Sequence, residues 1–247
     1  MATTFDSIGT GLAPGSYRAD QAFYRRMAVG IAGFILFGFA QFAVRGFVDV
    51  GAAPLWVHLH GLVFVSWVLL FVVQNLLAER GSMDLHRKLG WLGAALAVAM
   101  VALGSFTGIM AIALHRQPPF FAPPFFLALT QVQVVLFGTL FALAIRLRRR
   151  TEWHRRLMLA AIVLIMEPAF GRILPAPLLG GELMEWMTGA FQIGVLGIAM
   201  RHDVKVRGAV HPALWCGVLA IVGLHGSISL LSRFPPVIAI AQGLAGS

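Results

Sequence analysis

Seven long apolar runs constrain this sequence most, because each approaches the roughly 20 residues that an α-helix needs to cross the hydrocarbon core of a bilayer. Charged residues make up only 12% of the 247-residue chain, against about a quarter in a soluble domain. That is too little polar surface for a water-facing globule, so a soluble enzyme is excluded. We predict an all-α membrane protein with seven transmembrane helices, within residues 27–48, 55–77, 89–114, 122–145, 157–177, 184–200 and 212–231.

The segments on either side of this bundle are of different kinds. Residues 1–26 are polar and Gly-rich and have no apolar segment behind an early basic cluster, unlike a cleavable signal peptide. We expect a cytoplasmic tail over 1–26, a transmembrane bundle over 27–231 and an external apolar tail over 232–247. The last segment begins near Pro235 and Pro236 and is too short to span, so we expect it at the membrane interface.

Basic residues predict the orientation, because Lys and Arg in short loops stay cytoplasmic. Alternate loops place 15 of the 19 Lys and Arg residues on one side, and the net charge of +9 resides there. The N-terminus is therefore expected in the cytoplasm and the C-terminus outside, in a cell inner membrane with anionic lipids at the cytoplasmic face. This distribution argues against nucleic acid as a partner. The other side carries only Arg45, Arg116, Arg172 and Arg233.

A weak repeat marks three of the cytoplasmic loops, which read DLHRKL at 84–89, EWHRRL at 152–157 and AVHPAL at 209–214. Each copy places its histidine, His86, His154 or His211, in the first turn of the following helix. This similarity predicts one N-terminal helix followed by three similar hairpins. We expect the neighbouring Arg and Lys side chains to reach lipid phosphates.

Two of these helix entries resemble those of a family of uncharacterised bacterial multi-pass membrane proteins. The chain has an HR-x-x-G entry at His86, an HRR-x-M entry at His154, and an arginine, Arg172, eighteen residues after the second histidine. The resemblance covers roughly residues 56–176. It implies a fold and a location in a bacterial membrane but no reaction.

Polar residues inside apolar helices are costly unless they are paired or hydrated, so they are candidates for function. Helical phase places several of them on shared faces: His60 with Gln74, His154 with Arg172, Glu185 with Gln192, and His211 with His225. These faces predict a bundle with a polar interior. Glutamines there are equally expected as hydrogen-bonding links between helices, and Arg172 with Glu167 or Glu185 as a buried pair that fixes packing. The polar groups fall into an outer layer of His60, Glu167, Arg172, Glu185 and His225 and an inner layer of Gln74, His86, His154 and His211.

Two layers of histidine are what a b-type haem protein requires, since haem iron takes axial imidazoles from both sides of the ring. On this hypothesis His60 and His225 hold an outer haem b, His86 and His154 hold an inner one, and Arg172 pairs with a propionate. The protein would then move electrons across the membrane to or from a redox partner.

Two other classes remain open. The polar faces could line a passage for a proton, an ion or a small solute, with imidazoles and Glu185 as relay groups. They could instead lock the helices of a scaffold subunit. The sequence contains no P-loop, HExxH motif or nucleophile elbow, and its single cysteine excludes an internal disulfide. No reaction or substrate is named by these patterns.

Overall fold

The computed structural model describes residues 14–174 and 180–246, with side chains from residue 20 onward. Within these ranges the secondary structure is entirely helical. The helices are α1 (Pro14–Val44), α2 (Leu55–Glu79), α3 (Met83–Ala113), α4 (Pro123–Arg146), α5 (Thr151–Leu164), α6 (Glu167–Ile173), α8 (Gly181–Arg207), α9 (Pro212–Leu231) and α10 (Pro235–Ala245).

Six of the described helices are long and apolar enough to cross a membrane, namely α1 from Asp20, α2, α3, α4, α8 and α9. The protein is therefore a multi-pass membrane protein. The predicted fifth helix, 157–177, is not continuous: α5 ends at Leu164 and the short α6 begins at Glu167, and residues 175–177 lie outside the described part of the chain. The seven-helix count and the likeness of the three hairpins stay predictions.

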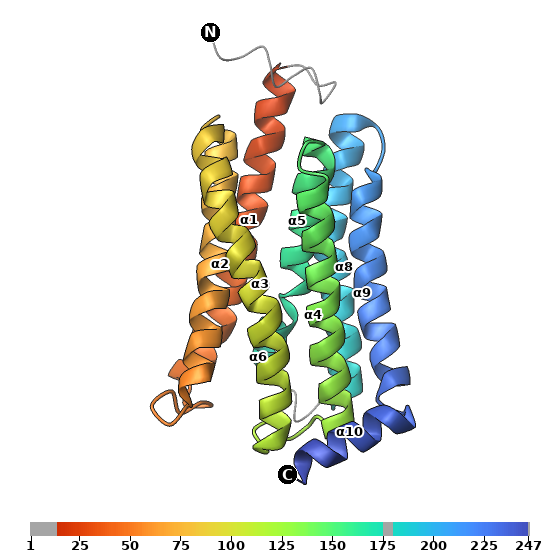
Figure 1. The fold of residues 1–247 in the computed structure, drawn as a ribbon. Helices are drawn as coiled ribbons and strands as arrows, with labels where there is room; N and C mark the ends of the chain where they lie inside the picture. Colours follow the sequence, from red (N-terminus) through yellow and green to blue (C-terminus); the bar gives the residue numbers. More distant parts are fainter. Residues whose placement is uncertain (1–13, 175–179, 247) are drawn as a thin grey trace.

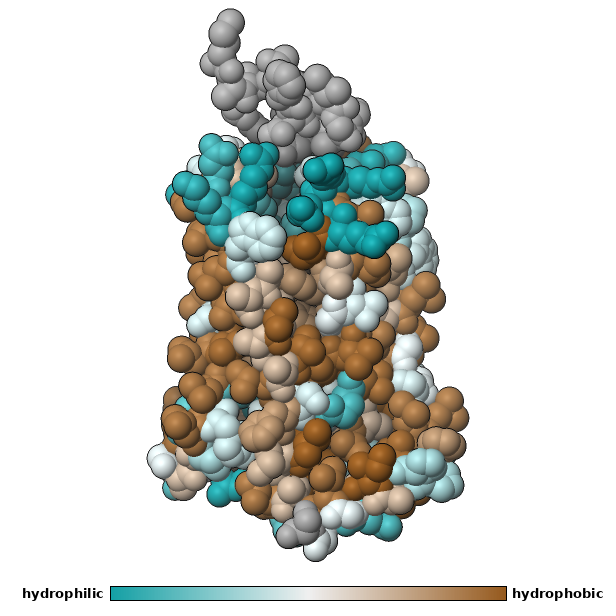
Figure 2. Space-filling view, viewed as in Figure 1, coloured by the Kyte–Doolittle hydropathy of each residue, from teal (hydrophilic) through white to brown (hydrophobic). Residues whose placement is uncertain are grey.

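The helices pack side by side, with α1 beginning at one end of the bundle and α10 lying across the other (Figure 1). Three turns lie at the end where α1 begins, joining α2 to α3, α4 to α5 and α8 to α9; we call this the basic end. Gly81 and Gly208 adopt positive φ angles of 74° and 78° in two of these turns, a conformation that side chains with a Cβ rarely adopt. Hydrophilic residues gather at this end in Figure 2, above sides that are largely apolar.

Helix α5 is the central element of the bundle, in contact with α4, α8, α9 and α1. Its residues from Leu157 to Leu164 are almost all inaccessible to solvent, as expected for a helix that is apolar on every side. It packs closely against α9, because a Cβ atom at Gly217 would lie 2.7 Å from the Cβ of Ala160. A bulkier residue at 217 would force these two helices apart.

Glutamines from two neighbouring helices donate to backbone carbonyls at the break between α5 and α6, in addition to the hydrogen bond from the Met166 N–H to the Val163 carbonyl at 3.1 Å. Gln192 of α8 donates from Nε2 to the carbonyls of Val163 and Leu164, at 3.0 and 2.9 Å. Gln133 of α4 donates to the Leu164 carbonyl at 3.1 Å. Pro168, near the start of α6, has no N–H to continue a regular helix across the break.

Both end segments differ from the sequence expectation in structure. Helix α1 begins at Pro14, inside the segment expected as a polar tail. The apolar stretch after Pro235 is the helix α10, which packs against α3 and α4, and its short length agrees with an interfacial position.

Candidate functional site

Glu185 and His225 form a buried contact between α8 and α9. Nδ1 of His225 lies 2.7 Å from Oε1 of Glu185, and the two residues are only 2% and 3% exposed. The angles of this contact are not those of a hydrogen bond, so both Glu185 oxygens lack a hydrogen-bond partner among the described residues. The imidazole fits against α8 only because residue 189 is glycine, where a Cβ would lie 2.7 Å from Cδ2 of His225.

Gln192 fixes the protonation of the other ring nitrogen. Its Nε2 donates to the Val163 and Leu164 carbonyls, which leaves Oε1 facing Nε2 of His225 at 2.9 Å. An amide oxygen only accepts, so Nε2 of His225 carries the proton in this bond. The predicted shared face of Glu185 and Gln192 thus meets a single histidine ring.

Glu167 and Arg172, both on α6, complete this outer group of polar residues. Glu167 is buried, interacts electrostatically with both Glu185 and Arg172, and accepts a 3.4 Å hydrogen bond from Gln133. Arg172 donates to the carbonyl of Pro168 at 2.7 Å and lies 4.2 Å from the centre of the Phe39 ring. We call Glu167, Arg172, Glu185, Gln192 and His225 the buried carboxyl site.

Arg172 does not have the direct carboxylate partner that the sequence suggested. No carboxylate oxygen lies within 4 Å of it in the described ion pairs, and Glu182 pairs instead with Arg233 at 3.1 Å. The break between α5 and α6 interrupts the helical phase that would connect residues 154 and 172, so their alignment stays a prediction. A single-helix phase calculation cannot foresee such an interruption.

His60 has neighbours other than His225, and it interacts electrostatically with Arg172. Its ring stacks on Phe64 of the same helix, with centroids 4.1 Å apart, and its Nδ1 is buried without a hydrogen-bond partner among the described residues. Nε2 of His225 bonds Gln192, and its Nδ1 lies 2.7 Å from Glu185 without the angles of a hydrogen bond. The shared haem ligation of these two histidines therefore gains no support from their contacts.

His86 and His154, by contrast, lie together near the basic end. Their ring centroids are 6.4 Å apart and the rings are nearly perpendicular, at 84°. Nδ1 of His86 bonds the carbonyl of Gln74 at 3.2 Å, and Gln74 returns a 3.1 Å bond from Nε2 to the carbonyl of His86. Nδ1 of His154 bonds the carbonyl of Ala144 at 2.9 Å.

His211, the third histidine of the repeat, has a different role. It lies just before α9 and caps that helix, with Nδ1 accepting from the backbone N–H of Ala213 at 3.1 Å. Its ring meets Trp153 edge to face, at 5.1 Å between centroids. Burial, together with the nearby Arg156 and Arg207, lowers the pKa of His211 to about 4, so the capping imidazole is neutral near pH 7.

A buried ionic cluster at the basic end was missed by the sequence reasoning. Arg155 and Arg156 were expected to reach lipid phosphates, but their exposed fractions are 9% and 0%. That expectation was wrong, because three carboxylates surround the two guanidiniums inside the protein. The cluster consists of Asp20 of α1, Glu152, Arg155 and Arg156 of α5, and Asp203 and Arg207 of α8.

Arg156 makes the most extensive contacts in this cluster. Its Nε donates to Asp203 at 2.8 Å, a second guanidinium nitrogen pairs with the same carboxylate, and Nη1 lies 2.5 Å from Glu152. Arg155 pairs with Asp20 and with Glu152. Three arginines and three carboxylates balance in charge, and they join α1, α5 and α8.

One signal in the sequence could have revealed this cluster. Glu152 precedes Arg155 and Arg156 by three and four residues, the spacing at which helical side chains meet, and the run enters an all-apolar helix. The corresponding residue of the first repeat copy, Arg87, is not buried: its side chain is 73% exposed and pairs with Asp84. The two copies have similar sequences, but only the second is buried by the surrounding helices.

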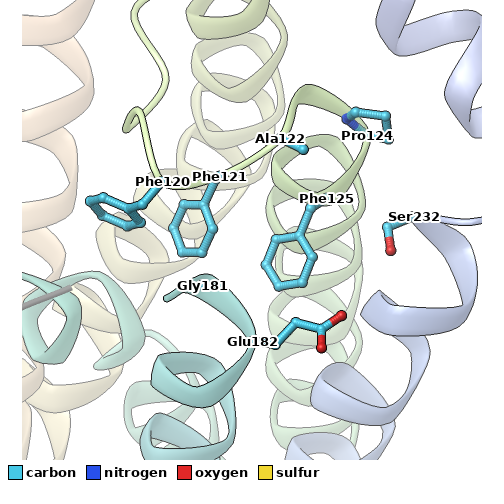
Figure 3. Close-up of a pocket in the computed structure, with 8 residues that line it drawn as sticks. All are labelled: Phe120, Phe121, Ala122, Pro124, Phe125, Gly181, Glu182 and Ser232. Atoms are coloured by element: carbon cyan, nitrogen blue, oxygen red, sulfur yellow. The ribbon is translucent and has the colours of Figure 1, made fainter. Parts of the chain in front are cut away.

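Two cavities lie outside these clusters, and neither is lined by a histidine. One, of about 290 Å³, lies between Phe120, Phe121 and Phe125 on one side and Gly181 with Glu182 on the other (Figure 3). The second, of about 410 Å³, is almost wholly apolar and lies beside α10. Neither adjoins the histidines that were expected to ligate haem.

Comparison with known proteins adds no further assignment. A scan against family models, a search of curated proteins and a search of solved structures found no match to this chain. The class that the structure defines is a multi-pass helical membrane protein, and its function has to be argued from the buried polar groups.

Proposed function

We propose that this multi-pass membrane protein is a proton-coupled carrier, with the buried carboxyl site as the place where a proton binds and leaves. The sequence left a transporter, a haem protein and a scaffold subunit open. The positive-inside distribution and the resemblance stated above favour the bacterial inner membrane, with the basic end in the cytoplasm.

The contact between His225 and Glu185 carries this proposal. Because Nε2 of His225 donates to Gln192, a neutral ring would present a bare lone pair at Nδ1, 2.7 Å from a carboxylate oxygen. Two acceptors this close repel unless one of them is protonated. The pair therefore holds one proton, on the imidazole or on the carboxyl group.

The charges around the pair also support the binding of one proton. Glu167 and Glu185 are two buried carboxyl groups, and Arg172 is the permanent cation beside them. With both carboxylates ionised and His225 neutral, the site would carry an uncompensated negative charge inside the protein, which is costly. One additional proton on Glu185, Glu167 or His225 makes the site neutral, and this is the proton that the carrier would exchange.

The break between α5 and α6 would allow the environment of the buried carboxyl site to change. Interrupted membrane helices with irregular backbone occur where they are buried in protein or line a pathway, and many transporters place their binding sites there. Here Glu167 begins α6 directly after the break, and Gln192 links the break to His225. Movement of α6 would thus alter the surroundings of the proton.

Access to this site differs between the two sides. Glu185 is four residues from the start of α8, about 6 Å along the helix axis, at the end opposite the basic end. Toward the basic end lie the buried helix α5 and the buried ionic cluster. This arrangement favours proton exchange with the external side in the conformation described. The buried ionic cluster would close the route to the cytoplasmic side.

Proton flux in liposomes tests the proposal. Purified protein is reconstituted with a pH-sensitive dye inside, and a proton gradient with a membrane potential is imposed. We expect flux above that of empty liposomes, reduced at least about tenfold by Glu185→Gln, because the amide cannot bind the proton. Glu182→Gln is the matched control, since Glu182 lies three residues earlier on α8, is 63% exposed and pairs with Arg233.

The outcomes separate the classes. Flux that is absent, or unchanged in Glu185→Gln, contradicts the carrier and leaves the scaffold subunit. Haem-dependent electron transfer has a separate signature: protein purified after haem supplementation would show a Soret band that weakens on replacing His60 or His225. Haem ligation would require His225 to give up its hydrogen bond to Gln192 or its close contact with Glu185, which disfavours that result.

A further inference from the structure

The histidines of the two matching repeat copies, His86 and His154, are in contact, and the proposed function does not involve them. His86 is the fourth residue of α3 and His154 the fourth residue of α5, and their rings are neighbours, 6.4 Å apart. Both side chains are half-buried. The pair belongs to the basic end, well separated in sequence and in hydrogen bonding from the buried carboxyl site.

The hydrogen bonds of both rings leave the same nitrogen available. Each Nδ1 faces a backbone carbonyl, of Gln74 for His86 and of Ala144 for His154. A carbonyl only accepts, so each Nδ1 carries the proton and each neutral ring keeps its lone pair on Nε2. This is the tautomer found in metal-binding histidines, whose second nitrogen usually donates to a carbonyl or carboxylate.

A third electron-pair donor belongs to Gln74, which is hydrogen-bonded to His86. Gln74 uses Nε2 to bond the carbonyl of His86, which leaves its Oε1 buried and without a hydrogen-bond partner among the described residues. A buried acceptor without a donor is costly. The two Nε2 atoms and this amide oxygen are three electron-pair donors that no hydrogen bond among the described residues uses.

We propose that His86 and His154 bind a divalent transition-metal ion through Nε2, with the amide oxygen of Gln74 beside it. Imidazole nitrogens bind Zn²⁺ at about 2 Å, which places each ring centre about 3 Å from the ion and the two centres at most about 6 Å apart. The 6.4 Å separation is slightly longer, so binding draws the rings together by a small rotation. Water fills the remaining coordination positions.

The site would bind metal from the side of the basic end. Imidazole donors suit Zn²⁺, Cu²⁺ and Ni²⁺, whereas Mg²⁺ and Ca²⁺ prefer oxygen ligands. Two arginines act electrostatically on the pair, Arg87 on His86 and Arg148 on His154. Both are exposed, and Arg87 is paired with Asp84, so water screens their charges. An ion here would connect the start of α3 to the start of α5, the helix that carries the buried ionic cluster.

Equilibrium binding of Zn²⁺ to the purified full-length protein, prepared without a histidine tag, tests this site. We expect one Zn²⁺ per chain in the wild type and a loss of affinity of about a hundredfold in His86→Asn and in His154→Asn. Asparagine preserves an N–H donor for the carbonyl while it removes the Nε2 ligand, so these variants should fold. Size-exclusion profile and melting temperature verify that they do.

His58→Asn and His115→Asn are the matched controls, because both histidines are exposed and lie at the opposite end of the bundle. They should bind Zn²⁺ as the wild type does. Cu²⁺ in place of Zn²⁺ gives a second readout, in which electron paramagnetic resonance should show two nitrogen ligands in the wild type and one in each variant. Absence of Zn²⁺ binding in the wild type, binding retained in a His86 or His154 variant, or equal loss in the controls would overturn the proposal.

Discussion

The imidazole of His225 occupies the space that a side chain at Gly189 would need, with Cδ2 of the ring 2.7 Å from the position of a Cβ at residue 189. Gly189 lies between Glu185 and Gln192 on α8, and both of these residues also contact the ring. A glycine in the middle of a helix lowers its stability by about 0.5–1 kcal/mol relative to alanine. Here the glycine makes room for the histidine.

Gly189→Ala should therefore displace His225. We expect a loss of about 1–3 kcal/mol in unfolding free energy from overpacking, measured by reversible unfolding in mixed micelles, together with reduced proton flux. Gly194→Ala is the control on the same helix, because a Cβ there meets nothing within 4 Å. It should be neutral or more stable by up to about 1 kcal/mol. An equal response of the two variants would show that His225 is not held by this glycine.

Arg156→Met should strongly destabilise the protein. The guanidinium is fully buried and pairs with Asp203 and Glu152, so its removal leaves buried carboxylates without compensation, at a cost of about 3–5 kcal/mol. Arg233→Met, which breaks an exposed pair with Glu182, should cost less than about 1 kcal/mol. The same unfolding assay measures both, and similar losses would argue against a buried ionic cluster.

The stability of the cap on α9 should depend on pH. The folded-state pKa of His211 is about 4, below its value of about 6.5 in an unfolded chain, so the unfolded state takes up the proton first. The stabilisation is complete above pH 6.5 and is lost as the pH falls from 6.5 toward 4, because a protonated Nδ1 cannot accept from Ala213.

Melting temperatures across this pH range test the His211 cap. His211→Asn keeps a capping oxygen that does not titrate, so its melting temperature should fall less steeply with acid than that of the wild type. Asp203, Glu152, Arg156 and Arg207 surround His211 and are common to both proteins. Parallel curves would mean that His211 does not set the slope.

Reporter fusions test the orientation. A reporter placed after Arg150, in the turn between α4 and α5, should be cytoplasmic, and one placed at Ser247 should be external. The basis is the concentration of Lys and Arg at the basic end and the position of α10 at the other end (Figure 1). Reporters that respond from the same side would refute an odd number of crossings.

The apolar runs and the charge asymmetry were sufficient to predict a helical membrane protein and the residue ranges of most of its helices. Hydropathy is a property of each segment alone, so α2, α4 and α9 begin and end close to the predicted positions. The break after Leu164 was not predictable in this way. Pro168 is a sequence signal for an interruption near this point, but the break also involves Gln133 and Gln192 of other helices, which both donate to the Leu164 carbonyl.

For the polar residues too, properties of a single helix were predictable and contacts between helices were not. Phase on one helix correctly grouped Glu185 with Gln192, whose contacts converge on His225. Phase could not show that Arg155 is buried against Asp20 of α1 while Arg87, in a near-identical motif, faces solvent. Those outcomes depend on which helices are neighbours, and a single sequence does not encode that in any local pattern.

The central claim is that the 2.7 Å contact between Nδ1 of His225 and Oε1 of Glu185 holds one proton, on the imidazole or on the carboxyl group. Nitrogen-15 NMR of histidine-labelled protein in lipid bilayers measures this directly, with the His225 signals assigned from their absence in His225→Asn. We predict a wild-type Nδ1 that is protonated or strongly hydrogen-bonded, and a neutral ring protonated only at Nε2 in Glu185→Gln. A wild-type spectrum with a bare Nδ1, the same as in Glu185→Gln, would contradict the account.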